Sequence, residues 1–235
     1  MIIYANGDSH TAGAEAVNTY AFANDDPRLF YMGRQPHPEN AQVAWPKILG
    51  DLIKMPVHNN AESAASNQRI MRTTREWLDT TTHRDIFAII QWSTWEREEW
   101  FYQGEYYQVT ASGTDDVPDA LKQQYKEFIA NSNWAQAAKQ AHQDIWAFHE
   151  ELNTRNIPHL FFNGNWAWDT KYITAKSWNK SYIGPYDQNL CYSQWLKNNG
   201  FSTVAPNSYH FGKKEHTHWA RFVLQYIIDN KLIQL

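Results

Sequence analysis

The sequence predicts an α/β protein, a three-layer α/β/α sandwich around a central parallel sheet of about five strands. Short apolar runs alternate along the chain with stretches that have helical spacing. The clearest run, residues 85–91, is continuously apolar between Ile86 and Ile90, which is typical of a parallel strand that helices cover on both faces. No internal repeat, low-complexity tract or linker interrupts the pattern. We therefore expect residues 1–235 to form a single domain.

Each element follows from its local pattern of apolar residues, turn residues and prolines. The predicted strands are residues 2–5, 56–59, 85–91, 158–163 and 201–205. The predicted helices are residues 11–22, 45–54, 67–82, 119–153 with a break near 131–133, 187–199 and 213–230. Residues 24–44 form an excursion loop in this interpretation, and aromatic-rich insertions lie near 92–118 and 164–185.

Composition excludes several classes of protein. The chain is 43% hydrophobic with a formal net charge of -4, so it has the core of a globular domain and no basic surface for nucleic acid. A single cysteine, Cys191, excludes an intramolecular disulfide. No apolar run approaches the roughly 18 residues of a membrane span, and the first strand leaves no room for a signal peptide. We expect a cytoplasmic protein without a membrane or nucleic-acid partner, and the oligomeric state stays open.

The first strand runs directly into Gly7-Asp8-Ser9. Gly7 permits a tight bend, and Asp8 can shape the turn through its own backbone. Ser9 then lies at the carboxyl end of a strand and near a helix start, where open α/β sheets place ligands and where backbone N–H groups favour negative charge. The sequence therefore indicates a nucleophilic serine. The alternative is that Asp8 and Ser9 are an ordinary helix N-cap pair.

A partner for Ser9 follows the last predicted strand, where Asn207-Ser208-Tyr209-His210 forms a loop at the same sheet edge. A serine hydroxyl is a weak nucleophile until a base removes its proton, and histidine suits that task. His210, His216 and His218 could instead be metal ligands. However, His216 and His218 are two residues apart and would face apart on a helix, and no cysteine or carboxylate accompanies them at a recognised spacing.

Taken in order, these blocks resemble the SGNH hydrolases, also called GDSL esterases. That family begins with Gly-Asp-Ser, here Gly7-Asp8-Ser9, and ends with Asp-x-x-His and a second histidine six residues later, here Asn207-x-x-His210 and His216. Its second block, Asn-x-Ala-x-x-Gly-x-Ser-Asn, matches residues 59–67, and its third block matches residues 91–94. The resemblance covers nearly the whole chain and implies the flavodoxin-like fold of that family.

The resemblance also implies roles. Ser9 attacks an ester carbonyl, and His210 is general base and then general acid. The backbone N–H groups of Ser9 and Ala64 hold the oxyanion, with Ser93 as a third donor. Three positions depart from the family: Ala64 replaces a glycine, Ser93 an asparagine, and Asn207 the aspartate before the histidine. With Asn207 neutral, the enzyme is slow, another group orients His210, or activity is lost.

The expected substrate is an ester with a small acyl group or a carbohydrate-linked one, and no cofactor is needed. Twelve tryptophans, several of them in polar surroundings, suit the flat faces of sugars, although core packing would explain them equally. The expected substrate-binding residues are Asp8, Asn67, Trp92, Trp95 and Trp166. The alternative function, from another class, is a catalytically silent carbohydrate-binding module that keeps the fold.

Overall fold

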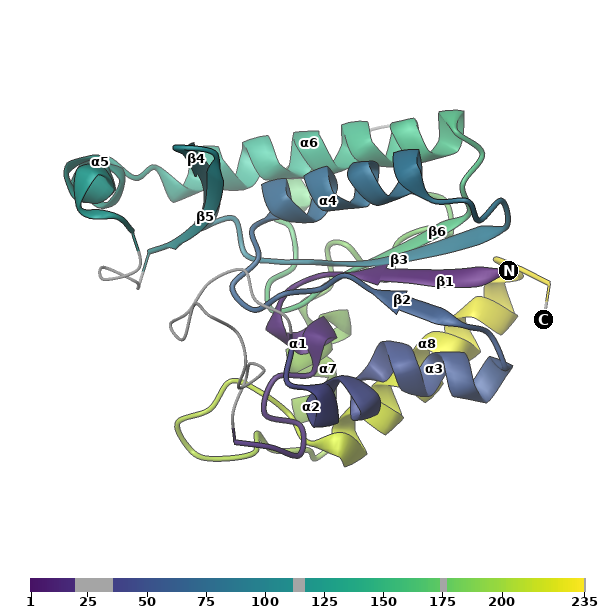
Figure 1. Cartoon of the computed structure of the whole chain (residues 1–235). Coiled ribbons are helices and arrows are strands. Elements are labelled where there is room, and N and C mark those ends of the chain that lie inside the picture. Colours follow the sequence, from purple (N-terminus) through teal and green to yellow (C-terminus); the bar gives the residue numbers. More distant parts are fainter. Residues whose placement is uncertain (20–35, 112–116, 174–176, 235) are drawn as a thin grey trace.

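The computed structural model describes residues 1–19, 36–111, 117–173 and 177–234. Its centre is a parallel sheet in the order β2-β1-β3-β6. The strands are β1 (Ile2–Asn6), β2 (Val57–Asn59), β3 (Ile86–Trp92) and β6 (His159–Asn163). Figure 1 shows α4 and α6 on one face of this sheet and α3 and α8 on the other. The three-layer parallel α/β prediction is therefore confirmed.

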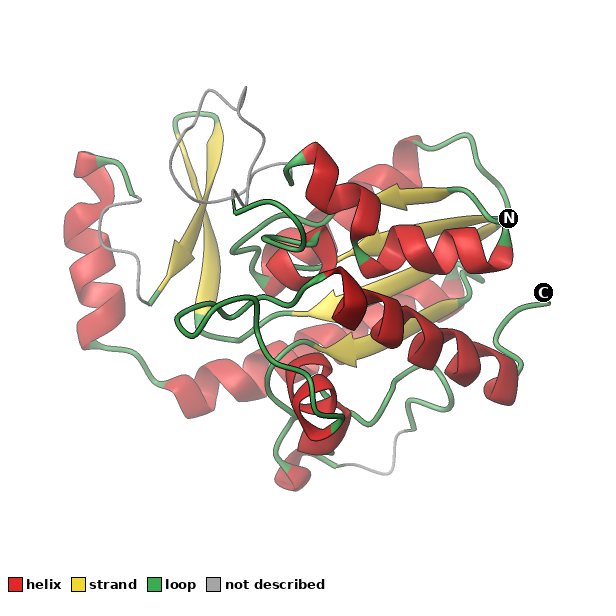
Figure 2. Cartoon of the chain, turned by 90° about the horizontal axis from the view of Figure 1, so that it is seen from below, coloured by secondary structure: helices red, strands yellow, loops and turns green. Residues whose placement is uncertain are grey.

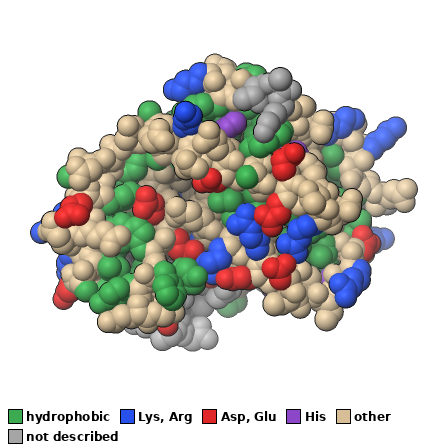
Figure 3. Space-filling view, turned by 90° about the horizontal axis from the view of Figure 1, so that it is seen from above, with side chains coloured by type: hydrophobic (Ala, Val, Ile, Leu, Met, Phe, Trp, Pro, Cys, Tyr) green, Lys and Arg blue, Asp and Glu red, His purple; other side chains and the backbone are tan. Residues whose placement is uncertain are grey.

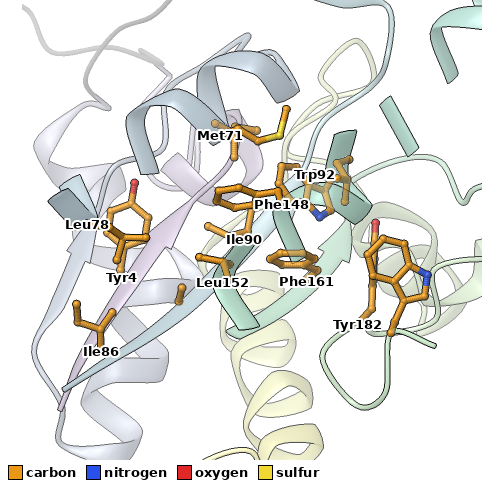
Figure 4. Close-up of a cluster of buried hydrophobic side chains, with 14 of the residues drawn as sticks. Tyr4, Met71, Leu78, Ile86, Ile90, Trp92, Phe148, Leu152, Phe161 and Tyr182 are labelled. Atoms are coloured by element: carbon orange, nitrogen blue, oxygen red, sulfur yellow. The ribbon is translucent and has the colours of Figure 1, made fainter. Parts of the chain in front are cut away.

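The two faces of the sheet hold separate apolar clusters. Alternate side chains of β1 point to opposite faces, so Tyr4 packs with α4 and α6, whereas Ile3 packs with α3 and α8. All five residues of β1 are buried because the strand lies between β2 and β3. Figure 4 shows the cluster on the α4 and α6 side. This burial on both faces explains why the strands are continuously apolar.

Most helices lie where the sequence pattern predicts them. The α-helices are α1 (Ser9–Ala12), α2 (Pro38–Val43), α3 (Trp45–Ile53), α4 (Asn67–Thr80), α5 (Lys122–Ala130), α6 (Trp134–Thr154), α7 (Tyr192–Asn198) and α8 (Lys213–Asn230). Single 3₁₀ turns span Asp119–Leu121, Thr170–Tyr172 and Gln188–Leu190. Among the helices of the described residues, none has both the length and the apolar character needed to cross a membrane.

The predicted helix 11–22 differs in extent. Among its described residues, 11–19, only the last two residues of the four-residue α1 are helical, because Gly13 adopts a left-handed conformation (φ 82°) that ends the helix. The tract 119–153 divides as predicted, and Asn133 caps α6 by accepting a hydrogen bond from the Gln136 backbone. Most of the predicted 24–44 loop lies outside the described residues, but its last part contains α2.

The predicted fifth strand, residues 201–205, is wrong. This segment has no strand pairing and instead folds back on its own loop, with the Val204 N–H donating to the carbonyl of His210. Tyr182, inside the predicted 164–185 insertion, makes an isolated parallel bridge to Phe161 of β6. The Ile183 N–H and the Ser181 carbonyl complete this pairing with Phe161. A short piece of loop therefore takes the edge position that a fifth strand would occupy.

The predicted 92–118 insertion contains an antiparallel hairpin, β4 (Arg97–Tyr102) and β5 (Glu105–Thr110). Gln103 and Gly104 at its tip both have positive φ, as a tight hairpin turn requires. Figures 1 and 2 show the hairpin and α5 standing apart from the main sheet, beyond the carboxyl ends of its strands. One face of the hairpin packs on α5 in a small third apolar cluster around Val109 and Tyr125.

The other face of the hairpin contacts α4 through charged side chains. Arg72 of α4 forms a two-pronged pair with Glu99 of β4, and its guanidinium lies 3.8 Å from the centre of the Tyr106 ring. A polar cavity of about 460 Å³ lies between α4 and the hairpin, and these three residues line part of it. Figure 3 shows basic and acidic side chains intermixed over the α4 and α6 face. The hairpin is therefore fixed to the body by ion pairs as well as by apolar packing.

A buried histidine pair lies at the opposite end of the sheet, where β6 begins. The ring nitrogen Nδ1 of His149 is 2.7 Å from Nε2 of His159, and Nδ1 of His159 is 2.8 Å from the carbonyl oxygen of Ile157. The Asn153 amide contacts the remaining nitrogen of His149. One pair of neutral tautomers satisfies this chain, whereas a proton added to either ring disrupts it. Burial accordingly lowers the pKa of His159 to about 4.

This pair makes the fold sensitive to acid. The unfolded chain protonates His159 near its ordinary value of 6.5, but the folded chain does so only near pH 4. The folded protein therefore binds fewer protons in this interval, and stability is lost as pH falls from 6.5 toward 4, by about 1.4 kcal/mol per pH unit for one such group. We expect the free energy of unfolding of His159→Gln to fall less steeply with decreasing pH than that of wild type. Urea denaturation at several pH values measures this slope. The exposed His83→Gln is the control, and an unchanged slope in His159→Gln would contradict the assignment.

Candidate active site

Ser9 is the first residue of α1 and directly follows the carboxyl end of β1. Asp8 caps this helix, its Oδ1 accepting a hydrogen bond from the His10 backbone N–H at 3.0 Å. Gly7 is required by close approach, because a Cβ there would lie 2.6 Å from the Thr11 hydroxyl. The N-cap alternative is thus present in the structure, and the same turn places Ser9 at the carboxyl edge of the sheet, where α/β proteins bind their ligands.

The Asp8 side chain is fully buried and bonded on both oxygens. Oδ1 also accepts from the Gln91 amide at 2.8 Å, and Oδ2 accepts from the Ser93 hydroxyl and the Arg97 guanidinium, each at 3.0 Å. The carboxylate has 0% exposure. Asp8 thus lies beneath the surface and links β1, β3 and β4, and its expected contact with substrate stays a prediction.

The charges around Asp8 have unequal roles. Burial alone would raise the pKa of Asp8, but His10, Arg97 and Gln91 outweigh it, and the pKa is lowered. Burial also lowers the pKa of His10 to about 4, so this ring is neutral near pH 7. Arg97 is therefore the cation that compensates the buried carboxylate at neutral pH.

Ser93 and Asn67 join the second and third family blocks. The Ser93 hydroxyl donates to Asp8 and accepts from Arg97 at 2.8 Å, so its single proton is already committed. The Asn67 amide brackets the Ser93 backbone, accepting from its N–H at 2.8 Å and donating to its carbonyl at 3.2 Å. In this arrangement Ser93 offers no free proton to an oxyanion. The Asn67 side chain, which we expected to face substrate, links two loops.

Ala64 keeps the backbone conformation that a glycine would adopt. Its φ is 61°, in the left-handed region. The loop around it is fixed by the buried Arg69, which pairs with Glu62 at 2.6 Å and donates to the carbonyl of Asn60 at 3.2 Å. The Glu62 N–H in turn donates to the carbonyl of Gly7. The second block therefore lies against the Gly7-Asp8-Ser9 turn despite the missing glycine.

His210 lies beside this turn, and its Nδ1 contacts Glu15. The Nδ1 to Oε2 distance is 2.5 Å, and the His210 ring meets the His10 ring edge-on with centroids 5.7 Å apart. The predicted orienting residue, Asn207, is exposed and makes no hydrogen bond with His210 in the described part of the chain. Ser9 and His210 are likewise not hydrogen-bonded to each other among these residues, as in many ligand-free enzymes whose catalytic contacts tighten on binding.

The three C-terminal histidines do not converge on one point. His216 is buried in the first turn of α8 and its Nδ1 accepts from the Trp45 N–H at 3.2 Å. His218 packs against Phe201, with ring centroids 4.7 Å apart and the two ring planes tilted by 46°. Within the described ranges, no group of three or more histidine, cysteine or carboxylate side chains is placed to hold a metal ion. His216 is instead a buried residue that accepts from the backbone at the start of α3.

Core packing explains several of the tryptophans. Trp92 is 1% exposed and packs edge-on against Phe148 and Phe161, as Figure 4 shows. Trp92 is therefore part of the core in this structure, and its expected contact with substrate stays a prediction. Trp95 is half-buried against Trp168, with ring centroids 5.3 Å apart. Trp166 differs because 56% of it is exposed.

Trp166 follows Asn165, whose side chain accepts from the Ser193 hydroxyl at 2.6 Å and also bonds to His10. That contact brings the loop after β6 to the residue next to Ser9. Of the three tryptophans expected to bind substrate, Trp166 therefore keeps the free surface that such a role requires.

Sequence reasoning missed Glu15, Arg97 and Gln91. Gln91 could have been suspected as a polar residue that ends a continuously apolar strand. Arg97 lies in the insertion and Glu15 in the turn after α1, and neither belongs to a family block. No local pattern identifies their partners, which are 89 and 195 positions away in the sequence.

Arg97→Ala leaves the Asp8 carboxylate buried without its cation. We expect the free energy of unfolding to fall by about 3 kcal/mol, because removing one partner of a buried pair costs roughly 3–5 kcal/mol and Arg97 is partly exposed. The control is Arg155→Ala, which removes a surface pair with Asp79 and should change stability by less than about 1 kcal/mol. Urea denaturation measures the free energy of unfolding of both variants. Equal decreases would show that the buried Asp8–Arg97 pair contributes no more to stability than a surface pair.

Several solved structures resemble the fold of this chain. A protein assigned to the lipolytic G-D-S-L family from Desulfitobacterium hafniense DCB-2 matches with a TM-score of 0.50 and 15% identity, over 95% of this chain and 98% of that chain. A member of the lipolytic G-D-S-L family from Veillonella parvula DSM 2008 matches with a TM-score of 0.47 and 13% identity, over 96% and 97% of the two chains. An acetyl xylan esterase from the rumen bacterium Butyrivibrio proteoclasticus has a TM-score of 0.43 and 11% identity, over 97% of this chain and 63% of that one.

The first of these matches shows the fold of the GDSL, or SGNH, proteins, as the sequence blocks predicted. Comparison with curated protein sequences gives no match. A family model does match residues 32–221, which is most of the chain. The chain therefore belongs to DUF6071, which is described as a family of unknown function.

Proposed function

We propose that this protein is a serine hydrolase that cleaves an ester bond. One observation carries the proposal: Ser9 begins a helix at the carboxyl edge of the sheet, and the next residue, His10, meets the ring of His210, whose Nδ1 contacts a carboxylate. A nucleophile, a base and a group that orients the base are the three parts that acyl transfer requires. The GDSL fold adds support at the level of fold alone.

The chemistry assigns each part a step. When Nδ1 of His210 carries a proton toward Glu15, Nε2 is free to accept the Ser9 proton as Oγ attacks the ester carbonyl. The tetrahedral oxyanion takes hydrogen bonds from the backbone N–H groups of Ser9 and Ala64. The protonated His210 then gives its proton to the departing alcohol. Water, activated by the same ring, releases the acid from the acyl-enzyme and restores Ser9.

Two donors rather than three serve the oxyanion in this scheme. The Ser93 proton is directed to Asp8, so Ser93 has a supporting role in which it holds the loop after β3. The left-handed conformation of Ala64 supports its assignment as the second donor, because a residue without that geometry would turn its N–H elsewhere.

The proposed substrate is an ester with a small acyl group or one linked to a carbohydrate. Trp166 supports the carbohydrate half of this proposal, since an exposed indole next to the site can stack on the flat face of a sugar ring. The net charge of -4 gives no general attraction for polyanionic substrates.

Labelling with a fluorophosphonate tests the nucleophile directly. We expect wild-type protein to be labelled at Ser9 and Ser9→Ala not to be labelled, because only an activated serine reacts quickly with this probe. Ser63→Ala is the matched control, since Ser63 is a buried serine in the neighbouring second block. A wild-type protein that takes up no label would favour the silent carbohydrate-binding module instead.

Trp166→Ala tests the substrate surface. We expect kcat/KM on a sugar ester to fall about 10-fold while hydrolysis of p-nitrophenyl acetate changes little, since a stacking contact is worth roughly 0.5–1.5 kcal/mol. The melting temperature should move little because the side chain is exposed. Trp92→Ala is the contrasting variant, and its loss should be in stability. Equal effects of Trp166→Ala on both esters would remove the support for a sugar substrate.

A further inference from the structure

The carboxylate that faces His210 comes from an unexpected part of the chain. The family position three residues before the histidine holds a neutral side chain, Asn207, yet the imidazole Nδ1 has a carboxylate 2.5 Å away. That carboxylate is Glu15, six residues after the candidate nucleophile. We propose that Glu15 is the positioning residue of the catalytic histidine, in place of the aspartate that this chain lacks; the proposal rests on the hydrolase function proposed above.

Glu15 is held in place from several directions. Its Oε2 also accepts from the Ser208 hydroxyl at 2.6 Å, and that hydroxyl accepts from the His210 backbone N–H at 3.0 Å. Ser208 therefore links the carboxylate to the histidine a second time. The next residue, Ala16, accepts from the Lys213 N–H at the start of α8. The segment after α1 is thus attached to the loop that carries His210.

The Glu15 backbone is strained where the side chain is needed. Its φ is 59°, a left-handed conformation that is unfavourable for a residue with a Cβ. Downstream, the buried Asn40 side chain accepts from the backbone N–H groups of Val17 and Asn18 and holds this turn. A glycine would remove the strain at position 15 but also the carboxylate. Retention of glutamate there is consistent with a role for its side chain.

Charge at Glu15 suits the role. Burial alone would raise the pKa of Glu15, but the hydrogen bonds from Ser208 and His210 outweigh burial, and the pKa is lowered. The carboxylate is therefore ionised at neutral pH. It can accept the Nδ1 proton, hold the ring with Nε2 toward the reaction, and stabilise the imidazolium that forms when Ser9 loses its proton. An amide can accept the same proton but supplies no charge.

Substitutions at positions 15 and 207 test the proposal. We expect Glu15→Gln to lower kcat and the rate of Ser9 labelling by about 10²–10⁴-fold with KM little changed, since a comparable change of carboxylate to amide in a serine protease costs about 10⁴ in kcat. Asn207→Ala is the matched control, with both rates within about 2-fold of wild type. A labelling rate for Glu15→Gln within about 3-fold of wild type, or an equal loss in Asn207→Ala, would overturn the proposal.

A spectroscopic measurement covers the case in which Glu15→Gln does not fold. In wild-type protein with ¹⁵N-labelled histidine, a proton shared between Nδ1 of His210 and a carboxylate gives a far-downfield resonance, which His210→Gln removes and Asn207→Ala retains. Absence of that resonance from wild-type protein would refute the contact without any variant at Glu15. Labelling distinguishes the failure of the hydrolase proposal from the failure of the Glu15 proposal. If wild-type protein takes up no label at Ser9, both proposals are overturned. If wild-type protein is labelled and Glu15→Gln is labelled at the same rate, only the role of Glu15 is overturned.

Discussion

The candidate site depends on one buried carboxylate, Asp8. A carboxylate with no exposure is tolerated only when hydrogen bonds and a cation replace its water. Gln91, Ser93 and Arg97 meet that need with the His10 backbone N–H, and they come from β3, from the loop after it and from the hairpin. Satisfying this one charge therefore fixes the position of the Ser9 turn relative to three other segments.

That constraint gives the hairpin a structural role. Arg97 is the first residue of β4, so the cation that compensates Asp8 is delivered by an insertion rather than by the sheet. The hairpin is also anchored to α4 by the pair between Arg72 and Glu99. The serine at position 93 fits the same arrangement, because its small hydroxyl bonds to Asp8 and Arg97 at once.

The sequence predicts what depends on local pattern and fails where partners are distant. Apolar runs located β1, β3 and β6, and the Gly-Asp-Ser turn located Ser9. The segment 201–205 has the composition of a strand, but composition does not reveal that Tyr182 pairs with β6 instead. Trp92 ends a strand beside polar residues, and the sequence does not reveal that its side chain packs in the core. Glu15 was missed because its partner is 195 positions away.

Backbone strain marks the candidate site independently of any motif. Several non-glycine residues have positive φ, and most are explained by local structure: Lys54 and Lys231 cap helices, Gln103 lies in the hairpin turn, and Asn156 and Asn179 are asparagines, which tolerate that region. Glu15 and Ala64 have no such explanation. They lie in the two loops that flank Ser9, each fixed by its own contacts, Ser208 for one and the Arg69–Glu62 pair for the other. Because such conformations persist only where surrounding structure enforces them, their location on both sides of Ser9 favours this turn as the candidate site.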